Sequence, residues 1–343
     1  MPIPTSTWDT ALWGETCAIP TAVSATLQAQ DGFDALARYL SSADGRVIVT
    51  GNGAAYYVGM TLLLASLQSA VDHPEIAVVP AGVVCGPAFG WRSNDALLVI
   101  SSSGELRDVV ELTSVRPDLR LAVVTSSPDS TLARAAQVTA GVTVHSQEAV
   151  THTQAYAANV AAALAVWARV SGDSTLAAAV DAAPQVCAEA QQRAAEWATS
   201  AVAGLGDVTA GVVFGSDSAW PAAMEAALLL KEVARVPVEG METREGGTTG
   251  MYALGAQHLV LSLPTGGDRL LAEAEESCRR AGATVLTAPT ADIGDPRLAA
   301  LTTFAPAVAL ATLLAIRGGH DVDSPAWTDA YYATARVTSE EKQ

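Results

Sequence analysis

The sequence predicts an α/β protein built from two doubly wound parallel sheets. Three observations support this prediction. Short apolar segments alternate with longer helical segments, which is typical of parallel sheets because each parallel connection needs a crossover. The alternation occurs twice, once over residues 41–172 and again over residues 205–320. Half of the 343 residues are hydrophobic and 16% are charged, so the chain has enough apolar surface for two large cores.

The first half begins with a helical segment and continues as strands and helices in alternation. Residues 8–40 have apolar positions at helical spacing, with Pro20 at a break. Helices are also expected at 151–170 and 175–203, and the composition of residues 171–174 is that of a linker. The remaining pattern predicts strands at 47–50, 76–80, 96–101, 121–125 and 142–144, and helices at 54–69, 105–114 and 130–136.

The second half repeats this pattern. Residues 211–220 contain a strand, a glycine-containing turn and the start of a helix, as residues 47–57 do. Residues 259–268 repeat the pattern of residues 96–105, and residues 284–288 repeat that of residues 121–125. We therefore predict a helical segment (1–40), two α/β domains (41–172 and 205–320), a connecting helix (173–204) and a tail (321–343).

Charge and cysteine spacing exclude several classes of protein. A net charge of −17 makes nucleic acid and anionic membranes poor partners, since both require a basic surface. The four cysteines lie far apart and the histidines show no ligand spacing, so neither a metal nor another cofactor is expected. The apolar run at 156–170 is too short and too rich in alanine to span a membrane, and residues 1–4 show no secretory signal. We expect a cytoplasmic protein with reduced thiols.

Glycines and hydroxyl side chains follow three predicted strands of the first half, where a doubly wound sheet binds its ligands. At a strand-to-helix turn, hydroxyls and unpaired N–H groups suit a phosphate, although helix capping is the commoner use of serine. The first group is not a dinucleotide fingerprint, because Tyr56 stands where a third glycine would belong. The candidate binding residues are Gly51, Asn52 and Gly53, then Ser101, Ser102, Ser103 and Glu105, and finally Ser126, followed by Ser130 as a candidate helix cap.

In their order and spacing these motifs resemble the SIS (sugar isomerase) domain family over almost the whole chain. They are most similar to the isomerase half of glucosamine-6-phosphate synthase and to stand-alone phosphosugar isomerases and deaminases. Residues 101–105 stand where the family has Ser-Gln-Ser-Gly-Glu, and residues 130–133 where it has Gly-Ser-x-Leu. Residues 225–232 match Glu-Gly-Ala-Leu-Lys-Leu-Lys-Glu, residues 321–325 match Asp-x-Asp-x-Pro, and residues 18–23 fall in the leading Gln-Pro helix. The resemblance implies two tandem flavodoxin-like three-layer domains without a glutaminase domain.

The resemblance also implies an activity. The family binds a phosphosugar and reacts through an enediol or enamine, in aldose–ketose isomerisation or in deamination or deglycation of an amino sugar. Glu232 falls at the position of the family's base, and a buried carboxylate with a raised pKa suits proton transfer between C1 and C2. Val150 and Thr151 join the expected substrate contacts. A homodimer is implied as well, because the loop at residues 242–252 completes a neighbouring site in this family.

Several family positions are substituted in this chain. Ala54 and Ala55 replace two hydroxyl residues, and Leu106 replaces the threonine that closes the serine loop. His152 lies where the family has serine, so it is either a second catalytic group with a pKa near neutrality or a hydrogen-bonded histidine at a helix start. The remaining changes are Thr248 for the ring-opening histidine, Leu229 for a helix lysine, and Ala335, beside Arg336, for the tail lysine.

These substitutions leave alternatives open. The chain is either an isomerase or deaminase that uses Glu232, or a catalytically degenerate protein that senses a sugar phosphate. A different anion or an unphosphorylated ligand is also compatible with the reduced number of hydroxyls, and a structural scaffold without a ligand is disfavoured by the serine cluster. For Glu232 itself, the competing interpretation is a simple ion pair with Lys231 or a contribution to the helix end.

Overall fold

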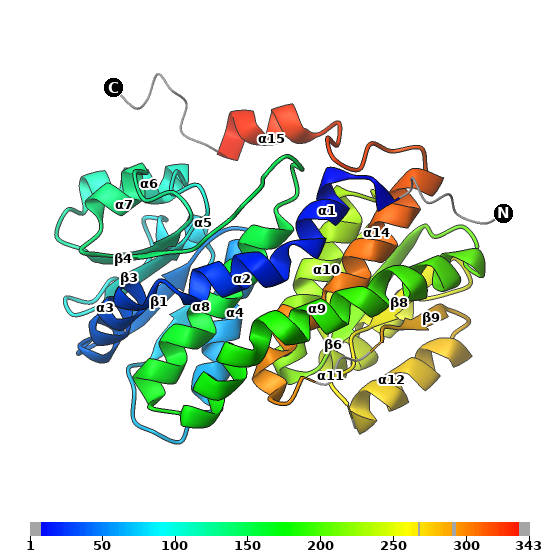
Figure 1. Ribbon diagram of the computed structural model, residues 1–343, viewed down its shortest axis with the longest axis horizontal. Helices are drawn as coiled ribbons and strands as arrows, with labels where there is room; N and C mark the ends of the chain where they lie inside the picture. Colours follow the sequence, from blue (N-terminus) through cyan, green and yellow to red (C-terminus); the bar gives the residue numbers. More distant parts are fainter. Residues whose placement is uncertain (1–7, 267, 290–292, 336–343) are drawn as a thin grey trace. The chain divides into compact units, whose positions relative to one another are not determined.

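The computed structural model describes residues 8–266, 268–289 and 293–335, and the chain divides into two compact units (Figure 1). The first-sheet unit contains residues 22–145, 155–181 and the described part of the chain after residue 325. The second-sheet unit contains the described residues up to 21, together with 146–154 and 182–325. Each unit is built on one parallel sheet.

The sheet of the first unit has five parallel strands in the order β2-β1-β3-β4-β5. This is a common doubly wound order, in which the direction of winding reverses between β1 and β3 and ligands bind beyond the carboxyl ends of the strands. The predicted α/β class is therefore confirmed. The strands are β1 (Val47–Thr50), β2 (Ile76–Val78), β3 (Ala96–Ile100), β4 (Arg120–Thr125) and β5 (Val138–Gly141).

Helices lie on both faces of the first sheet, as right-handed crossovers require when the winding reverses. Helix α4 (Ala54–Leu67) packs against β1 and β2, whereas α6 (Arg107–Val115) and α7 (Thr131–Ala135) lie on the opposite side in Figure 1. Strand residues that are fully apolar and almost completely buried fill the core between these layers. This unit also contains α3 (Gln30–Ser41), α5 (Ala81–Val84) and most of α8 (Thr153–Ser171).

Two predicted elements differ from the structure. The helical segment at 8–40 consists of α1 (Ala11–Cys17), α2 (Ile19–Leu27) and α3, and Pro20 occupies the first turn of α2, where no N–H is needed. The strand predicted at 142–144 was wrong, because β5 pairs with β4 from Val138 to Gly141. The N–H of Val142 donates the last bond of this ladder to Thr125 at 2.9 Å, so the more apolar residues that follow lie beyond the sheet.

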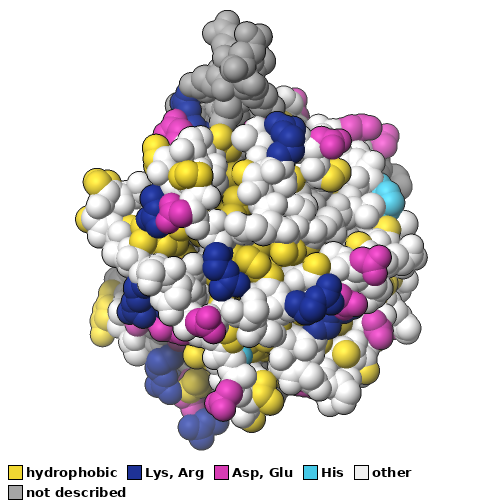
Figure 2. Space-filling view, turned by 90° about the vertical axis from the view of Figure 1, so that its left-hand side faces the viewer, with side chains coloured by type: hydrophobic (Ala, Val, Ile, Leu, Met, Phe, Trp, Pro, Cys, Tyr) yellow, Lys and Arg dark blue, Asp and Glu magenta, His cyan; other side chains and the backbone are white. Residues whose placement is uncertain are grey.

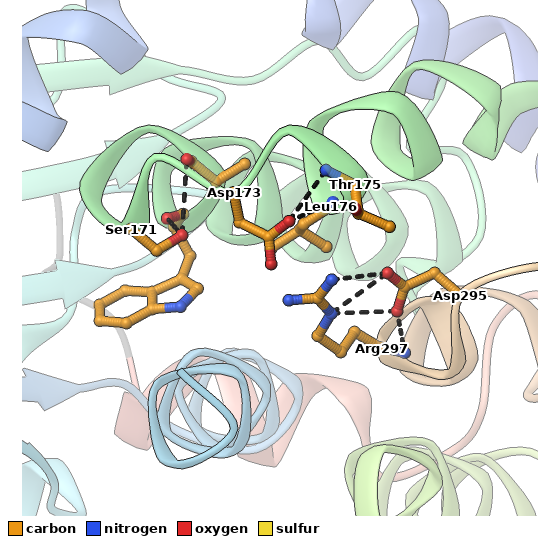
Figure 3. Close-up of polar contacts among 8 residues, drawn as sticks. Ser171, Asp173, Thr175, Leu176, Asp295 and Arg297 are labelled. Atoms are coloured by element: carbon orange, nitrogen blue, oxygen red, sulfur yellow. Dashed lines mark hydrogen bonds and ion pairs between the residues drawn. The ribbon is translucent and has the colours of Figure 1, made fainter. Parts of the chain in front are cut away.

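The predicted linker at 171–174 is a tight turn between α8 and α9 (Ser174–Ala203). Gly172 has a φ of +64°, which glycine adopts without strain. The carboxylate of Asp173 accepts hydrogen bonds from the N–H groups of Thr175 and Leu176, both at 2.9 Å, and so caps α9 (Figure 3). The same figure shows Arg297 paired with Asp295 in the second-sheet unit, at 2.6 Å.

The second sheet has four parallel strands in the order β7-β6-β8-β9, which repeats the order of the first four strands of the other unit. This repetition confirms the predicted doubling of the fold. The strands are β6 (Ala210–Gly215), β7 (Val238–Glu242), β8 (His258–Ser262) and β9 (Thr284–Thr287). The helical segments that accompany this sheet are η2 (Asp217–Ala219), α10 (Trp220–Glu232), α11 (Thr243–Thr248), η3 (Gly250–Ala253), α12 (Arg269–Arg280), η4 (Pro296–Leu298), α13 (Ala299–Thr302) and α14 (Ala305–Arg317). Helix α15 (Thr328–Ala335) comes next in the chain and belongs to the first-sheet unit.

One segment of the described chain, Pro296–Arg317, is long and apolar enough to cross a membrane. However, 94% of its most apolar window is buried within the structure, and α14 packs against α10 and α1. It is therefore a core helix of the second-sheet unit. On the face drawn in Figure 2, Lys and Arg side chains stand among acidic and uncharged ones.

Candidate functional site

A serine loop, residues 101–105, connects β3 to α6 at the carboxyl edge of the first sheet. Gly104 has a φ of +62°, and a Cβ atom at this position would lie 1.9 Å from Oγ of Ser130. Only glycine therefore allows the loop to fold back against the start of α7. The N–H of Gly104 donates to Oγ of Ser101 at 3.1 Å, which closes the loop on itself.

Neighbouring side chains brace this loop from inside the protein. The carbonyl oxygen of Ser102 accepts hydrogen bonds from the hydroxyls of Thr125, Ser126 and Ser127, at 3.0, 2.9 and 3.1 Å. One carboxylate oxygen of Glu105 accepts from the N–H of Thr131 at 3.1 Å, at the start of α7. The hydroxyl hydrogen of Ser126 and this oxygen of Glu105 are thus used within the scaffold.

The hydroxyls of the three serines in the loop accept hydrogen bonds from nearby N–H groups. Ser101 accepts from Gly104, Ser103 accepts from the N–H of Glu105 at 3.3 Å, and Ser102 has a long contact from the amide of Asn159 at 3.5 Å. These bonds use the oxygen of each hydroxyl as an acceptor and do not use its hydrogen. Hydroxyl donors of this kind suit phosphate oxygens.

Asn159 is a polar neighbour of the loop that the sequence analysis missed. It lies on α8 and is 3% exposed, and its amide also donates to the carbonyl of Ala155 at 2.6 Å. Within the described part of the chain, its Oδ1 atom has no hydrogen-bond partner. A single asparagine within the alanine-rich run at 155–165 is the signal that could have identified it, since a buried amide needs a polar partner.

The predicted glycine turn lies after β1 in the same unit. A Cβ atom on Gly51 would lie 2.9 Å from the carbonyl oxygen of Ile100, so glycine allows β1 and β3 to end side by side here. Gly53 has a φ of +53° and is the N-cap of α4, while Asn52 is exposed. Ala54 and Ala55 supply no hydroxyls, so what this turn can offer to an anion is its backbone N–H groups.

In the second-sheet unit, Glu232 ends α10 and meets the segment that contains Thr151. The hydroxyl of Thr151 donates to Oε2 of Glu232 at 3.1 Å. Burial raises the pKa of Glu232 to about 7, while the Thr151 hydrogen bond and the charge of Lys231 act in the opposite direction. The Lys231 side chain is exposed and lines a separate groove of about 690 Å³ with Tyr252 and His258. Glu232 is therefore a half-buried residue whose carboxyl titrates near neutrality, as a general base requires.

Buried acceptors hold the segment at 146–154 in place. Glu15, on α1, is 4% exposed, and its Oε1 atom accepts from the N–H groups of Glu148 and Ala149 at 2.6 and 3.1 Å and from the hydroxyl of Ser146 at 3.1 Å. The hydroxyls of Thr16 and Thr153 are 3.1 Å apart. Helix α1 thus anchors both sides of Thr151.

Asp323 ties the same segment to the end of the chain. Its carbonyl accepts from the N–H of Val150 at 3.0 Å, and its carboxylate accepts from the N–H groups of Ala11 and Leu12 at 2.9 and 2.8 Å. The Asp-x-Asp-x-Pro motif and the leading helix therefore meet at the residues beside Thr151. His152 is half-buried and follows Thr151 directly, in the same unit as Glu232.

A second carboxyl on α10, Glu225, was not predicted as a site residue. It is 2% exposed, and its Oε2 atom has no hydrogen-bond partner among the residues that the structure describes. Burial, together with the charge of Glu232, raises the pKa of Glu225 well above its usual range. An acidic residue in an otherwise apolar helix, two turns before Glu232, is the sequence signal for it.

The substituted family positions are placed as follows. Thr248 is exposed on α11, and its hydroxyl donates to the carbonyl of Arg244 at 2.9 Å. Tyr252, in the loop expected to reach a neighbouring subunit, is 85% exposed. Ala335 is the last residue of α15, and Arg336 lies outside the described residues.

Two parallel sheets with the same strand order, joined by long helices, define the tandem SIS-domain fold. Solved structures with sequence identities of 17–20% share it. The C-terminal domain of glucosamine-fructose-6-phosphate aminotransferase from Francisella tularensis is 20% identical, with a TM-score of 0.78 over 94% of this chain and 100% of that one.

Two further structures match almost as completely. Glucosamine-6-phosphate deaminase from Thermotoga maritima is 18% identical, with a TM-score of 0.74 over 92% of this chain and 98% of that one. Tagatose-6-phosphate ketose/aldose isomerase from Escherichia coli is 17% identical, with a TM-score of 0.72 over 94% and 98% of the two chains. No family model and no curated protein matches the sequence. The likeness thus lies in the fold.

Proposed function

We propose that the protein is a sugar-phosphate isomerase or an amino-sugar-phosphate deaminase or deglycase, in which Glu232 moves the proton between C1 and C2. The observation that carries this proposal is the environment of Glu232. The residue is half-buried, and its carboxyl has a pKa of about 7 and accepts a hydrogen bond from Thr151. A base with these properties can take a proton from carbon at neutral pH and return it.

The other candidate residues have supporting roles in this proposal. Ser101, Ser102 and Ser103 bind the phosphate through their hydroxyls, and the turn at residues 51–53 contributes N–H groups. Thr151 fixes the orientation of the Glu232 carboxylate, and His152 is the candidate for proton transfer at a sugar oxygen. The names of the three similar structures support the substrate class, since each contains the name of a sugar 6-phosphate.

A second candidate function is a sensor that binds a sugar phosphate without turnover. Thr248 favours it, because its hydroxyl is bonded to its own helix and cannot act as an acid in the way a histidine would. Ala54, Ala55 and Ala335 add to this argument, since alanine offers neither a hydroxyl nor a charge.

Hydrogen exchange at the carbon beside the carbonyl tests both functions. The protein would be incubated in deuterated water with glucose 6-phosphate, fructose 6-phosphate and glucosamine 6-phosphate, and NMR would measure deuterium at C2 of the two aldoses and at C1 of fructose 6-phosphate. We expect exchange with at least one of them, loss of exchange in Glu232→Gln with binding retained, and normal exchange in Glu239→Gln, which removes an exposed carboxylate of β7. Binding without exchange would support the sensor, and exchange that survives in Glu232→Gln would refute the assignment of the base.

We also propose that the protein is a cytoplasmic homodimer in which the loop at residues 242–252 contacts the neighbouring subunit. The exposed ring of Tyr252 supports this proposal, because large aromatic side chains are enriched in interfaces. Sedimentation at micromolar concentration should give a dimer, and Tyr252→Ser should weaken it. A monomer at that concentration would contradict the proposal.

A further inference from the structure

The groove of about 690 Å³ lies on the second-sheet unit, at the amino ends of its strands. Its lining includes Gly211, Val238 and His258, which stand at or next to the starts of β6, β7 and β8. Gly250 and Ala253 also line it, and such small residues leave the space open. A cavity of this size suits a small molecule. Because doubly wound sheets bind their ligands at the opposite, carboxyl edge, the groove is not where the fold places a phosphosugar.

Two opposite charges line this groove. Lys231, near the end of α10, and Glu239, on β7, are both exposed and both belong to the lining. Among the residues that the structure describes, neither side chain forms an ion pair or a side-chain hydrogen bond. Ion pairs do form elsewhere in the same unit, as between Arg279 and Glu275 at 2.8 Å. The groove therefore offers a positive and a negative group to a ligand.

Lysine is rare in this chain, which makes its place in the groove informative. Of the 19 Lys and Arg residues, only Lys231 and Lys342 are lysines. Arginine suits a fixed planar pair with a carboxylate, such as that of Arg46 with Asp95 at 2.6 Å. The ammonium group of lysine is instead a compact charge on a flexible stem, so Lys231 can adjust to a small ligand that other groups also hold.

Much of the remaining lining is apolar. Pro237 and Val238, where β7 begins, and Leu254, which follows η3, contribute hydrocarbon surface. A simple anion in the groove would meet the carboxylate of Glu239, and a simple cation would meet the ammonium group of Lys231. A ligand that suits both residues must carry one charge of each sign, together with an apolar group for the rest of the surface.

We propose that this groove binds an α-amino acid with an apolar side chain. The carboxylate of the amino acid pairs with Lys231, its ammonium group pairs with Glu239, and its side chain covers the apolar lining. The inference goes beyond the proposed function and does not depend on it, because neither Glu232 nor the serine loop lines the groove. An α-amino acid is a zwitterion near neutral pH, so it neutralises both groups of the protein at once.

Matched ligands test the two charges separately. Calorimetry at pH 7 would compare L-phenylalanine with 3-phenylpropionate, which lacks the ammonium group, and with 2-phenylethylamine, which lacks the carboxylate. We expect L-phenylalanine to bind about tenfold more tightly than either analogue, since each analogue loses one charge-assisted contact. An analogue that binds as tightly as L-phenylalanine would overturn the proposal. Failure of both L-phenylalanine and L-leucine to bind at about 10 mM would overturn it as well.

Variants and competition locate the ligand. Lys231→Gln and Glu239→Gln should each weaken the binding of L-phenylalanine about tenfold. Glu273→Gln, which removes an exposed carboxylate of α12 outside the groove, is the matched control and should leave binding unchanged. The unfolding temperature without ligand checks that each variant is folded, and the comparison of ligands needs no variant. Unchanged affinity in both groove variants, or competition between L-phenylalanine and glucose 6-phosphate, would overturn the assignment of the amino acid to this groove.

Discussion

Replacing Thr151 by valine removes a hydroxyl and keeps the shape of the side chain. The Thr151 hydroxyl donates to Glu232 at 3.1 Å, and this bond favours the ionised carboxylate. Without it, the pKa of Glu232, which burial has already raised to about 7, must rise further. The variant therefore tests whether this pKa controls the reaction.

The size of the effect follows from the strength of the bond. A hydrogen bond to a charged group contributes about 1.5–3 kcal/mol, and one pKa unit corresponds to about 1.4 kcal/mol. The pKa of Glu232 should therefore rise by about one to two units. At pH 7 the ionised fraction then falls from about half to between about one tenth and one hundredth, so kcat/KM falls roughly fivefold to fiftyfold.

The assay is the pH profile of kcat/KM with the most active sugar phosphate. The acid limb should move to higher pH in Thr151→Val, and activity should return above about pH 9, when the carboxyl ionises again. Thr151→Ser keeps the hydroxyl and is the matched control, with a limb near that of the unmodified protein. An acid limb that stays in place in Thr151→Val would refute the role given to this hydrogen bond.

Three further predictions concern stability. Folded Glu232 holds its proton up to a pKa of about 7, so its contribution to stability is present at low pH and is lost as the pH rises from about 4.5 to 7. The free energy of unfolding in urea should therefore decline by up to about 3 kcal/mol over this range in the unmodified protein but not in Glu232→Gln. The same pH dependence in both proteins would contradict this. Gly104→Ala should cost about 1–3 kcal/mol, since its φ is +62°, whereas Gly90→Ala, with open space around it, should change stability by less than about 0.5 kcal/mol; equal losses would argue against strain. Asp323→Ala should cost about 1 kcal/mol by removing the carboxylate that accepts from the first two N–H groups of α1, and an unchanged urea midpoint would show that these bonds contribute nothing.

The central strands of both sheets could be predicted from the sequence because buried parallel strands are continuous apolar runs that end at glycine or polar residues. The edge strand β5 could not be placed in this way. Its residues, Val138 to Gly141, are mostly half-buried and include threonine, alanine and glycine, which have no clear strand pattern. The more apolar residues after Gly141 fit the pattern better, but the pairing with β4 has already ended there.

The candidate site was predictable in its motifs and less so in the use of each side chain. The serine loop could be predicted because it follows the end of an apolar strand, and Glu232 because residues 225–232 match a helix motif of the family. That Ser126 braces the carbonyl of Ser102 depends on how β4 ends beside β3, which no local pattern contains. The unpaired carboxyl of Glu225 depends on burial, and burial is a property of the fold.

The path of the chain also limits how the protein can be divided. Residues 146–154 belong to the second-sheet unit although the residues on either side of them belong to the first. A fragment cut at 172, in the middle of the sequence, would contain Thr151 but would lack Asp323, which bonds to the preceding residue, and Glu232, which accepts its hydroxyl. Neither half can therefore be exchanged as a cassette, and a recombined or circularly permuted protein should keep α1, residues 146–154 and residues 321–325 together.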